Sequence, residues 1–159
     1  MTLTEKGIKV SEELAGIIGA ENGECFYNAL QGLMTADMGE AYYVEGVASN
    51  EVLLCHHGWL ELPGGLIVDP TPCYYERDKR LSPAAYYPAK KWLLHEVVDI
   101  MENDDDLLLP LLGWDGREFK SREYRDAYRA AAYDTFPGRF ADTYLSTLNK
   151  AYPNEEEVA

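Results

Sequence analysis

The sequence predicts an α+β domain, and the prediction rests on the order of its patterns. Two stretches with helical periodicity come first, and β-prone segments that a Pro-Gly-Gly turn can fold into a hairpin follow them. Helical patterns then return in the second half of the chain. The chain has 159 residues, of which 47% are hydrophobic, which is enough to bury one core. We therefore expect a single domain over residues 1–153 and an acidic tail over residues 154–159.

Composition narrows the classes of function. The formal net charge of -14 argues against a nucleic-acid partner or an acidic membrane surface, because both would be repelled. The first residues form neither the basic nor the apolar part of a signal peptide, and the sequence predicts no membrane span. Three cysteines, an odd number without disulfide spacing, fit a reducing compartment. We expect a cytoplasmic protein without a cofactor.

The first half of the chain predicts two helices. Ser11 is a candidate N-cap, followed by acidic residues and by apolar residues at helical spacing, so a helix is expected over residues 11–20. Gly19 and Gly23 bracket the loop that follows. Apolar residues then recur every three or four positions from residue 25 to about residue 37, as one buried helical face requires.

β-prone segments follow the second helix. Residues 41–48 and 51–62 read as strands separated by a turn at Ser49-Asn50. A hairpin loop at residues 63–65 then leads into a return strand over residues 66–69.

The second half predicts one long loop and three helices. The tyrosine- and proline-rich residues 73–91 are expected to form a loop folded over the sheet. The remaining segments are a helix over residues 92–102, an apolar connector over residues 107–114, a helix from the N-cap Ser121 to about Thr135, and a helix over residues 139–151.

Cys25 is the leading candidate for a catalytic residue. It lies where the second helix begins, and the free N–H groups and the positive end of the helix dipole favour a thiolate there. His57 and Asp69 follow along the chain, in the setting that a Cys-His-Asp acyl-transfer site needs. Taken alone, Cys25 would more often be a buried structural cysteine.

The length of the hairpin loop decides which histidine faces Asp69. With a three-residue loop at residues 63–65, Leu62 faces Leu66, and His57 lies diagonal to Asp69 on the same face of the sheet. With a two-residue loop the register shifts by one residue and His56 takes that place. The pattern alone leaves both registers open.

Four short motifs between residues 23 and 71 resemble the core of the transglutaminase-like, papain-related cysteine superfamily. They are Gly-Glu-Cys25, Tyr43-Val-Glu-Gly46, His57-Gly-Trp59 and Asp69-Pro-Thr71. The same motifs are similar to those of a group of uncharacterised bacterial and phage proteins. Gly58 departs from the alanine usual at that position, and from residue 73 onward no family motif is present.

The resemblance implies a papain/transglutaminase-like fold, with an antiparallel sheet packed on the helix that carries the nucleophile and a helical C-terminal part. It makes Cys25 the nucleophile, His57 the base and Asp69 the acid that orients the base, and it places Trp59 near the site. It also decides the histidine question in favour of His57.

The chemistry expected of these residues is acyl transfer on an amide, peptide or isopeptide bond. The Cys25 thiolate would form a thioester, which water resolves in a hydrolase and an amine resolves in a transferase. Hydrolysis is favoured, because a small domain shows no second substrate site. The partner is then a protein or peptide substrate, or a small amide.

Several residues are candidates for supporting roles. The Cys25 N–H and the Asn22 side chain are candidates for the oxyanion hole, and Asn28 for orienting the triad or the substrate. Trp59 and Glu45 are candidates for substrate binding. The alternatives are a core tryptophan, a solvent-facing Glu45, and asparagines that serve only the turn and the helix surface.

Two functions of other classes compete with the enzyme. One is a catalytically inactive binding protein that presents its acidic surface to a basic partner. The other is a structural zinc module using soft ligands that are close in sequence, namely Cys55, His56, His57 and Cys73. Adjacent strand residues point to opposite faces and no usual zinc spacing is present, so we predict no metal site.

Overall fold

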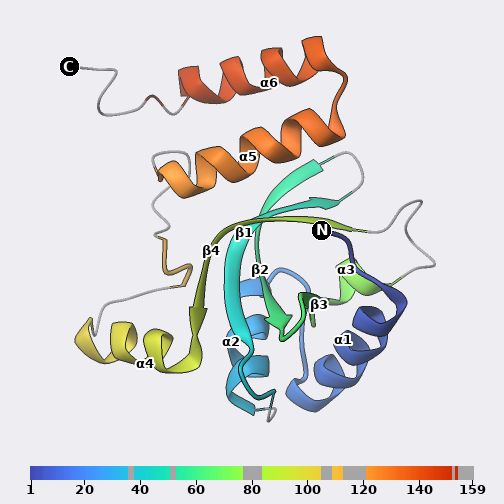
Figure 1. Ribbon diagram of the computed structural model, residues 1–159, viewed down its shortest axis with the longest axis vertical. Coiled ribbons are helices and arrows are strands. Elements are labelled where there is room, and N and C mark those ends of the chain that lie inside the picture. Colours follow the sequence, from blue (N-terminus) through green and yellow to red (C-terminus); the bar gives the residue numbers. More distant parts are fainter. Residues whose placement is uncertain are drawn as a thin grey trace.

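The computed structural model describes residues 1–35, 38–50, 53–76, 84–104, 109–112, 121–151 and 153. A four-stranded antiparallel sheet with strand order β3-β2-β1-β4 lies at its centre (Figure 1). The strands are β1 (Tyr42–Asn50), β2 (Leu53–Leu62), β3 (Leu66–Val68) and β4 (Ala85–Leu93).

Helices flank the sheet, so the predicted α+β class is confirmed. In the described part of the chain they are α1 (Glu5–Ile18), α2 (Cys25–Thr35), α3 (Pro72–Tyr75), α4 (Leu94–Asn103), α5 (Arg122–Thr135) and α6 (Gly138–Ala151). Figure 1 shows α5 and α6 stacked together at one end of the sheet, while α4 lies toward the opposite end. None of the described helices is long and apolar enough to cross a membrane.

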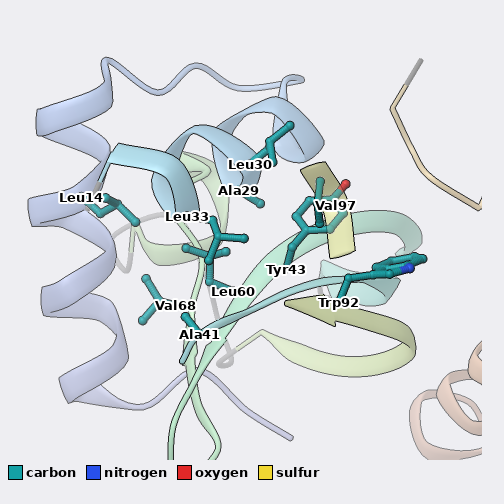
Figure 2. Packing of buried hydrophobic residues seen from close by; sticks show 10 residues of the cluster. All are labelled: Leu14, Ala29, Leu30, Leu33, Ala41, Tyr43, Leu60, Val68, Trp92 and Val97. Atoms are coloured by element: carbon teal, nitrogen blue, oxygen red, sulfur yellow. The ribbon is translucent and has the colours of Figure 1, made fainter. Parts of the chain in front are cut away.

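The main core lies between α2 and one face of the sheet (Figure 2). Ala29, Leu30 and Leu33 of α2 are buried at the spacing that the sequence predicts. They pack with buried side chains of the other elements, namely Leu14, Ala41, Tyr43, Leu60, Val68, Trp92 and Val97. This packing fixes the position of α2, and therefore of Cys25, against the sheet.

The hairpin between β2 and β3 has a three-residue loop at residues 63–65, which is one of the two loop lengths considered from the sequence. Leu62 pairs with Leu66 and Leu60 pairs with Val68. Gly64 and Gly65 have φ values of 86° and 83°, a conformation that glycine adopts without strain. The predicted turn at Ser49-Asn50 is wrong, since both residues belong to β1 and pair with Leu54 and Leu53.

The first helix begins earlier than its expected start at residue 11. Thr4 is the N-cap, and its hydroxyl accepts a hydrogen bond from the Gly7 N–H at 3.2 Å. Gly7 lies inside α1 because a Cβ there would come within 2.4 Å of the Ile67 carbonyl oxygen. The close approach of the α1 backbone to the backbone at Ile67 therefore explains why this helical position is a glycine. Ser11 lies within the helix and donates to the Gly7 carbonyl.

The predicted loop over residues 73–91 is wrong, because it contains α3 and most of β4. β4 is an edge strand, where a proline is tolerated since one side of the strand needs no ladder hydrogen bonds. Pro88 pairs with Gly46 beside a register shift between Glu45 and Gly46. Trp92 ends up in β4, so the following helix begins two residues later than expected, at Leu94.

The C-terminal helices agree closely with the sequence. Ser121 caps α5, its hydroxyl accepting from the Tyr124 N–H at 3.5 Å, and the helix ends at Thr135 as predicted. α6 starts one residue before its expected start. Only residues 109–112 of the predicted connector are described, and the predicted acidic tail over residues 154–159 lies outside the described residues.

Candidate functional site

The start of α2 lies against β2 beside His57. A Cβ built on Gly58 would stand 2.8 Å from Cδ1 of Phe26 and 3.5 Å from the carbonyl oxygen of Cys25. The strand can therefore approach the first turn of α2 this closely only because residue 58 has no side chain. This contact gives a reason for glycine at position 58.

His57 and Asp69 meet on one face of the hairpin. Nε2 of His57 lies 2.7 Å from Oδ2 of Asp69, and the two residues are 1% and 0% exposed. The three-residue loop predicts this juxtaposition, because Asp69 follows directly after Val68, the partner of Leu60. Nε2 is engaged by the carboxylate, so Nδ1 is the ring nitrogen left for the sulfur of Cys25.

The charge of the neighbouring groups keeps the His57 imidazole protonated. Burial by itself lowers the pKa of His57, but the charges of Asp69 and Cys25 and hydrogen bonds to both outweigh burial and raise that pKa to about 10. The site therefore pairs a buried imidazolium with the Asp69 carboxylate, and Cys25 lies beside that imidazolium.

Asp69 is held from three other directions. Its Oδ1 accepts a hydrogen bond from the Thr71 N–H at 3.0 Å, and its own N–H donates to the Ser11 hydroxyl at 2.8 Å. The hydroxyl of Tyr86, on β4, donates to Oδ2 at 2.7 Å. Sequence reasoning missed both Ser11 and Tyr86 as parts of this site. Ser11 read as a helix cap, and Tyr86 fell in the segment that read as a loop.

The two asparagines hold the loop before Cys25. The Asn28 side chain donates to the Glu21 carbonyl at 2.7 Å and accepts from the Glu21 N–H at 3.3 Å, and it also donates to the Thr71 hydroxyl at 3.3 Å. Oδ1 of Asn22 accepts from the Cys73 N–H at 2.8 Å. These bonds tie the loop to the segment that follows Asp69. A role for Asn22 in an oxyanion hole stays a prediction.

Aromatic rings surround the imidazole. The ring of Tyr74, on α3, stacks on His57 with centroids 3.9 Å apart, and Trp59 lies nearly parallel to His57 at 6.2 Å. Burial above all raises the pKa of Tyr74, so its hydroxyl stays neutral. Trp59 is fully buried, and its Nε1 has no hydrogen-bond partner in the described part of the chain. Trp59 is therefore a core residue that lies beside His57, and a role for it in substrate binding stays a prediction.

Glu45 is buried in the protein, so the interpretation of a solvent-facing strand residue is wrong. Its carboxylate accepts hydrogen bonds from the hydroxyls of Tyr43 at 2.7 Å and Tyr124 at 3.3 Å, and from the N–H groups of Leu111 and Leu112. Burial raises the pKa of Glu45, although these hydrogen bonds oppose the rise. The contacts join β1 to α5 and to the 111–112 turn, and a substrate-binding role for Glu45 stays a prediction.

His56 lies on the opposite face of β2 from His57, between α2 and α5. Its ring meets Phe26 edge-on at 5.2 Å and Tyr124 at 3.9 Å, and burial, with the charge of His57, lowers its pKa to about 3. The described residues contain no group of three or more histidines, cysteines or acids that could hold a metal ion. The hairpin thus separates the two histidines that the zinc hypothesis groups together.

Comparisons with protein-family models, with curated proteins and with solved structures found no match to this chain. The functional interpretation therefore rests on the residues and geometry described above.

Proposed function

We propose that this protein is a cysteine-dependent acyl-transfer enzyme of the papain or transglutaminase type, acting on an amide, peptide or isopeptide bond. Cys25 is the nucleophile, His57 the base and Asp69 the group that orients the base. One observation carries the proposal: a buried imidazole that is bound through Nε2 to a carboxylate and also interacts with a cysteine at the start of a helix. These residues match the roles in a thiol-imidazole-carboxylate triad.

The reaction proceeds in two steps. The Cys25 thiolate attacks the carbonyl carbon of the substrate, the C–N bond breaks, and the proton held by His57 passes to the leaving amine, which gives a thioester. His57 then removes a proton from water, whose oxygen attacks the carbonyl carbon of the thioester. The C–S bond breaks, the acid leaves, and the Cys25 sulfur and His57 share the proton taken from water. An amine in place of water would give transfer, and hydrolysis remains the favoured outcome.

The N terminus of α2 would stabilise the charge that develops on the carbonyl oxygen. Cys25 is the first residue of α2, and the N–H groups of a first helical turn have no partner within the helix. The Cys25 N–H can therefore donate to the oxyanion, and the helix dipole adds to the stabilisation. Asn22, in the loop just before α2, is the candidate for a second donor.

An acylation assay tests the proposal. The protein is incubated with p-nitrophenyl acetate, an activated ester that acylates nucleophilic cysteines, and the modified residue is identified by peptide mass spectrometry. We expect acetylation of Cys25 and catalytic release of p-nitrophenol, both lost in Cys25→Ala. Cys55→Ala is the matched control, because Cys55 is also a free, half-buried cysteine, and it should keep the activity. Equal acetylation of the three cysteines, or turnover that survives in Cys25→Ala, would refute the proposal that the protein is an enzyme with Cys25 as its nucleophile.

One observation favours a second function of another class. The imidazole is 1% exposed and lies under the ring of Tyr74, so a substrate has little access to it. A catalytically inactive binding protein would tolerate this burial and would use its net charge of -14 against a basic partner. The same assay separates the two functions, since a binding protein would not turn over the ester through Cys25.

A further inference from the structure

Tyr86 contacts the His57-Asp69 pair from β4. Its hydroxyl donates to Oδ2 of Asp69 at 2.7 Å, and the same oxygen is bound by Nε2 of His57 at 2.7 Å. Tyr86 and Asp69 are both 0% exposed, so water does not compete for this oxygen. Two donors from different strands therefore share one carboxylate oxygen inside the protein.

We propose that Tyr86 is a positioning residue of the acyl-transfer site, which fixes the Asp69 carboxylate and limits how tightly it holds the proton of the His57 imidazole. This inference rests on the function proposed above. It adds a fourth side chain to the Cys25, His57 and Asp69 triad, one that acts through Asp69 and has no contact of its own with the substrate.

The Tyr86 hydroxyl adds to the contacts that orient the carboxylate. The Thr71 N–H binds Oδ1 and the Ser11 hydroxyl accepts from the Asp69 N–H, whereas the donors to Oδ2 are His57 and Tyr86. The Tyr86 hydroxyl binds Oδ2 directly, and its ring is held by packing against Trp59, with centroids 5.1 Å apart. Packing within the sheet thus fixes the position of the Tyr86 hydroxyl. That hydroxyl in turn helps to fix Oδ2 of Asp69, the oxygen that binds His57.

The second contribution of Tyr86 is electrostatic. A hydrogen bond to a buried carboxylate draws part of its negative charge toward the donor, which weakens its attraction for a neighbouring imidazolium. Among the described residues, the other titratable groups near the imidazole are Cys25 from α2 and Tyr74 from α3, with His56 adjacent in sequence on the opposite face of β2. They remain in place when only the Tyr86 hydroxyl is removed. Tyr86→Phe should therefore leave the imidazolium facing a stronger carboxylate.

The expected result is that His57 keeps its proton to higher pH in Tyr86→Phe, by about 0.5 to 1 pH unit, the size expected when one buried hydrogen bond is lost. The measurement is a pH titration of histidine-labelled protein followed by long-range ¹H–¹⁵N NMR spectra, with His57 assigned through the His57→Gln variant. The spectra also report which ring nitrogen carries the proton.

Tyr43→Phe is the matched control. Tyr43 is likewise 0% exposed and donates to a buried carboxylate at 2.7 Å, but that carboxylate belongs to Glu45. Tyr43→Phe should lose about as much stability as Tyr86→Phe does. The pH at which His57 titrates should stay unchanged in Tyr43→Phe. A merely structural role for Tyr86 predicts the same behaviour for both variants, so an unchanged His57 titration in Tyr86→Phe overturns the proposal.

Site-specific replacement of Tyr86 by 3-fluorotyrosine covers the case in which Tyr86→Phe does not fold. The ring packing is kept while the hydroxyl becomes a stronger donor, so the His57 titration should move to lower pH. No shift, or a shift to higher pH, overturns the proposal.

Acetylation of Cys25 in the wild-type protein is measured in parallel. If Cys25 is acetylated but the titration of His57 does not respond to Tyr86, this inference fails and the proposed function stands. If Cys25 is not acetylated, the proposed function fails whatever the titration shows.

Discussion

Asp69→Asn is expected to slow the acetylation of Cys25 by p-nitrophenyl acetate by about 100-fold or more, in line with losses seen when the orienting acid of a triad becomes an amide. The carboxylate of Asp69 holds Nε2 of His57 at 2.7 Å and is the strongest influence that raises the pKa of that imidazole. An amide supplies neither the charge nor a fixed acceptor. His57 then loses both its orientation and its positive charge beside Cys25.

Glu45→Gln is the matched control for this substitution. It also converts a fully buried carboxylate into an amide, but its partners are Tyr43, Tyr124 and the 111–112 backbone. None of these partners belongs to the triad, so with this small ester we expect the acetylation rate of Glu45→Gln to stay close to that of the wild-type protein. A large loss would instead support the substrate-binding role predicted for Glu45. An Asp69→Asn variant that reacts as fast as Glu45→Gln would show that Asp69 has no part in the reaction.

Glu45→Ala is expected to lower the free energy of unfolding by about 3 to 5 kcal/mol, as measured by urea denaturation followed by circular dichroism. The substitution removes the acceptor shared by two tyrosine hydroxyls and two backbone N–H groups, and it leaves these donors buried without a partner. Because the contacts join β1 to α5, the C-terminal helices should lose their support first.

The loss should also depend on pH. Burial raises the pKa of Glu45 in the folded protein above its ordinary value of 4.5, so the folded state binds this proton more tightly than the unfolded state does. The resulting stability is present below that ordinary value and disappears as the pH rises through the raised pKa. The difference between Glu45→Ala and the wild-type protein should therefore be largest at low pH.

Glu61→Ala provides the comparison for the loss of an acidic side chain from an ion pair that solvent reaches. The Glu61 side chain is 13% exposed and pairs with Lys91, which is 45% exposed, at 3.1 Å, and an ion pair open to solvent contributes about 1 kcal/mol or less. A Glu45→Ala variant that loses no more stability than Glu61→Ala would contradict the structural role given to Glu45.

The sequence was sufficient for the parts of the site that depend on local patterns. The cysteine at a helix start and the hairpin loop at residues 63–65 are both local features, and the loop length sets the register. That register places His57 and Asp69 on the same face, which the observed 2.7 Å contact confirms. It also settles the choice between His56 and His57 that the pattern left open.

The contacts that surround the triad depend on packing between distant segments, which no local pattern encodes. Tyr86 lies in the edge strand β4, which the sequence predicts to be a loop because it contains Pro88. The pairing of β4 with β1 brings Tyr86 to Asp69. Glu45 reads as a surface residue because all its partners except Tyr43 lie far along the chain, and Tyr124 is 79 residues away. Serine is a common N-cap residue, so the sequence predicts that Ser11 caps the helix. Thr4 is the N-cap instead, and the Ser11 hydroxyl accepts a hydrogen bond from the Asp69 N–H.

Alkylation at mildly acidic pH tests most directly whether Cys25 and His57 form a thiolate-imidazolium pair. The protein is treated with iodoacetamide for increasing times, and the modification of each cysteine is followed by peptide mass spectrometry. Cys25, Cys55 and Cys73 form no disulfide and are all half-buried, so exposure alone predicts similar rates. An ion-paired thiolate is less nucleophilic than an ordinary one but far more abundant at this pH, and we expect Cys25 to react about tenfold faster than the other two. That advantage should vanish in His57→Gln. Equal rates for the three cysteines in the wild-type protein would contradict the ion pair and, with it, the proposed enzyme.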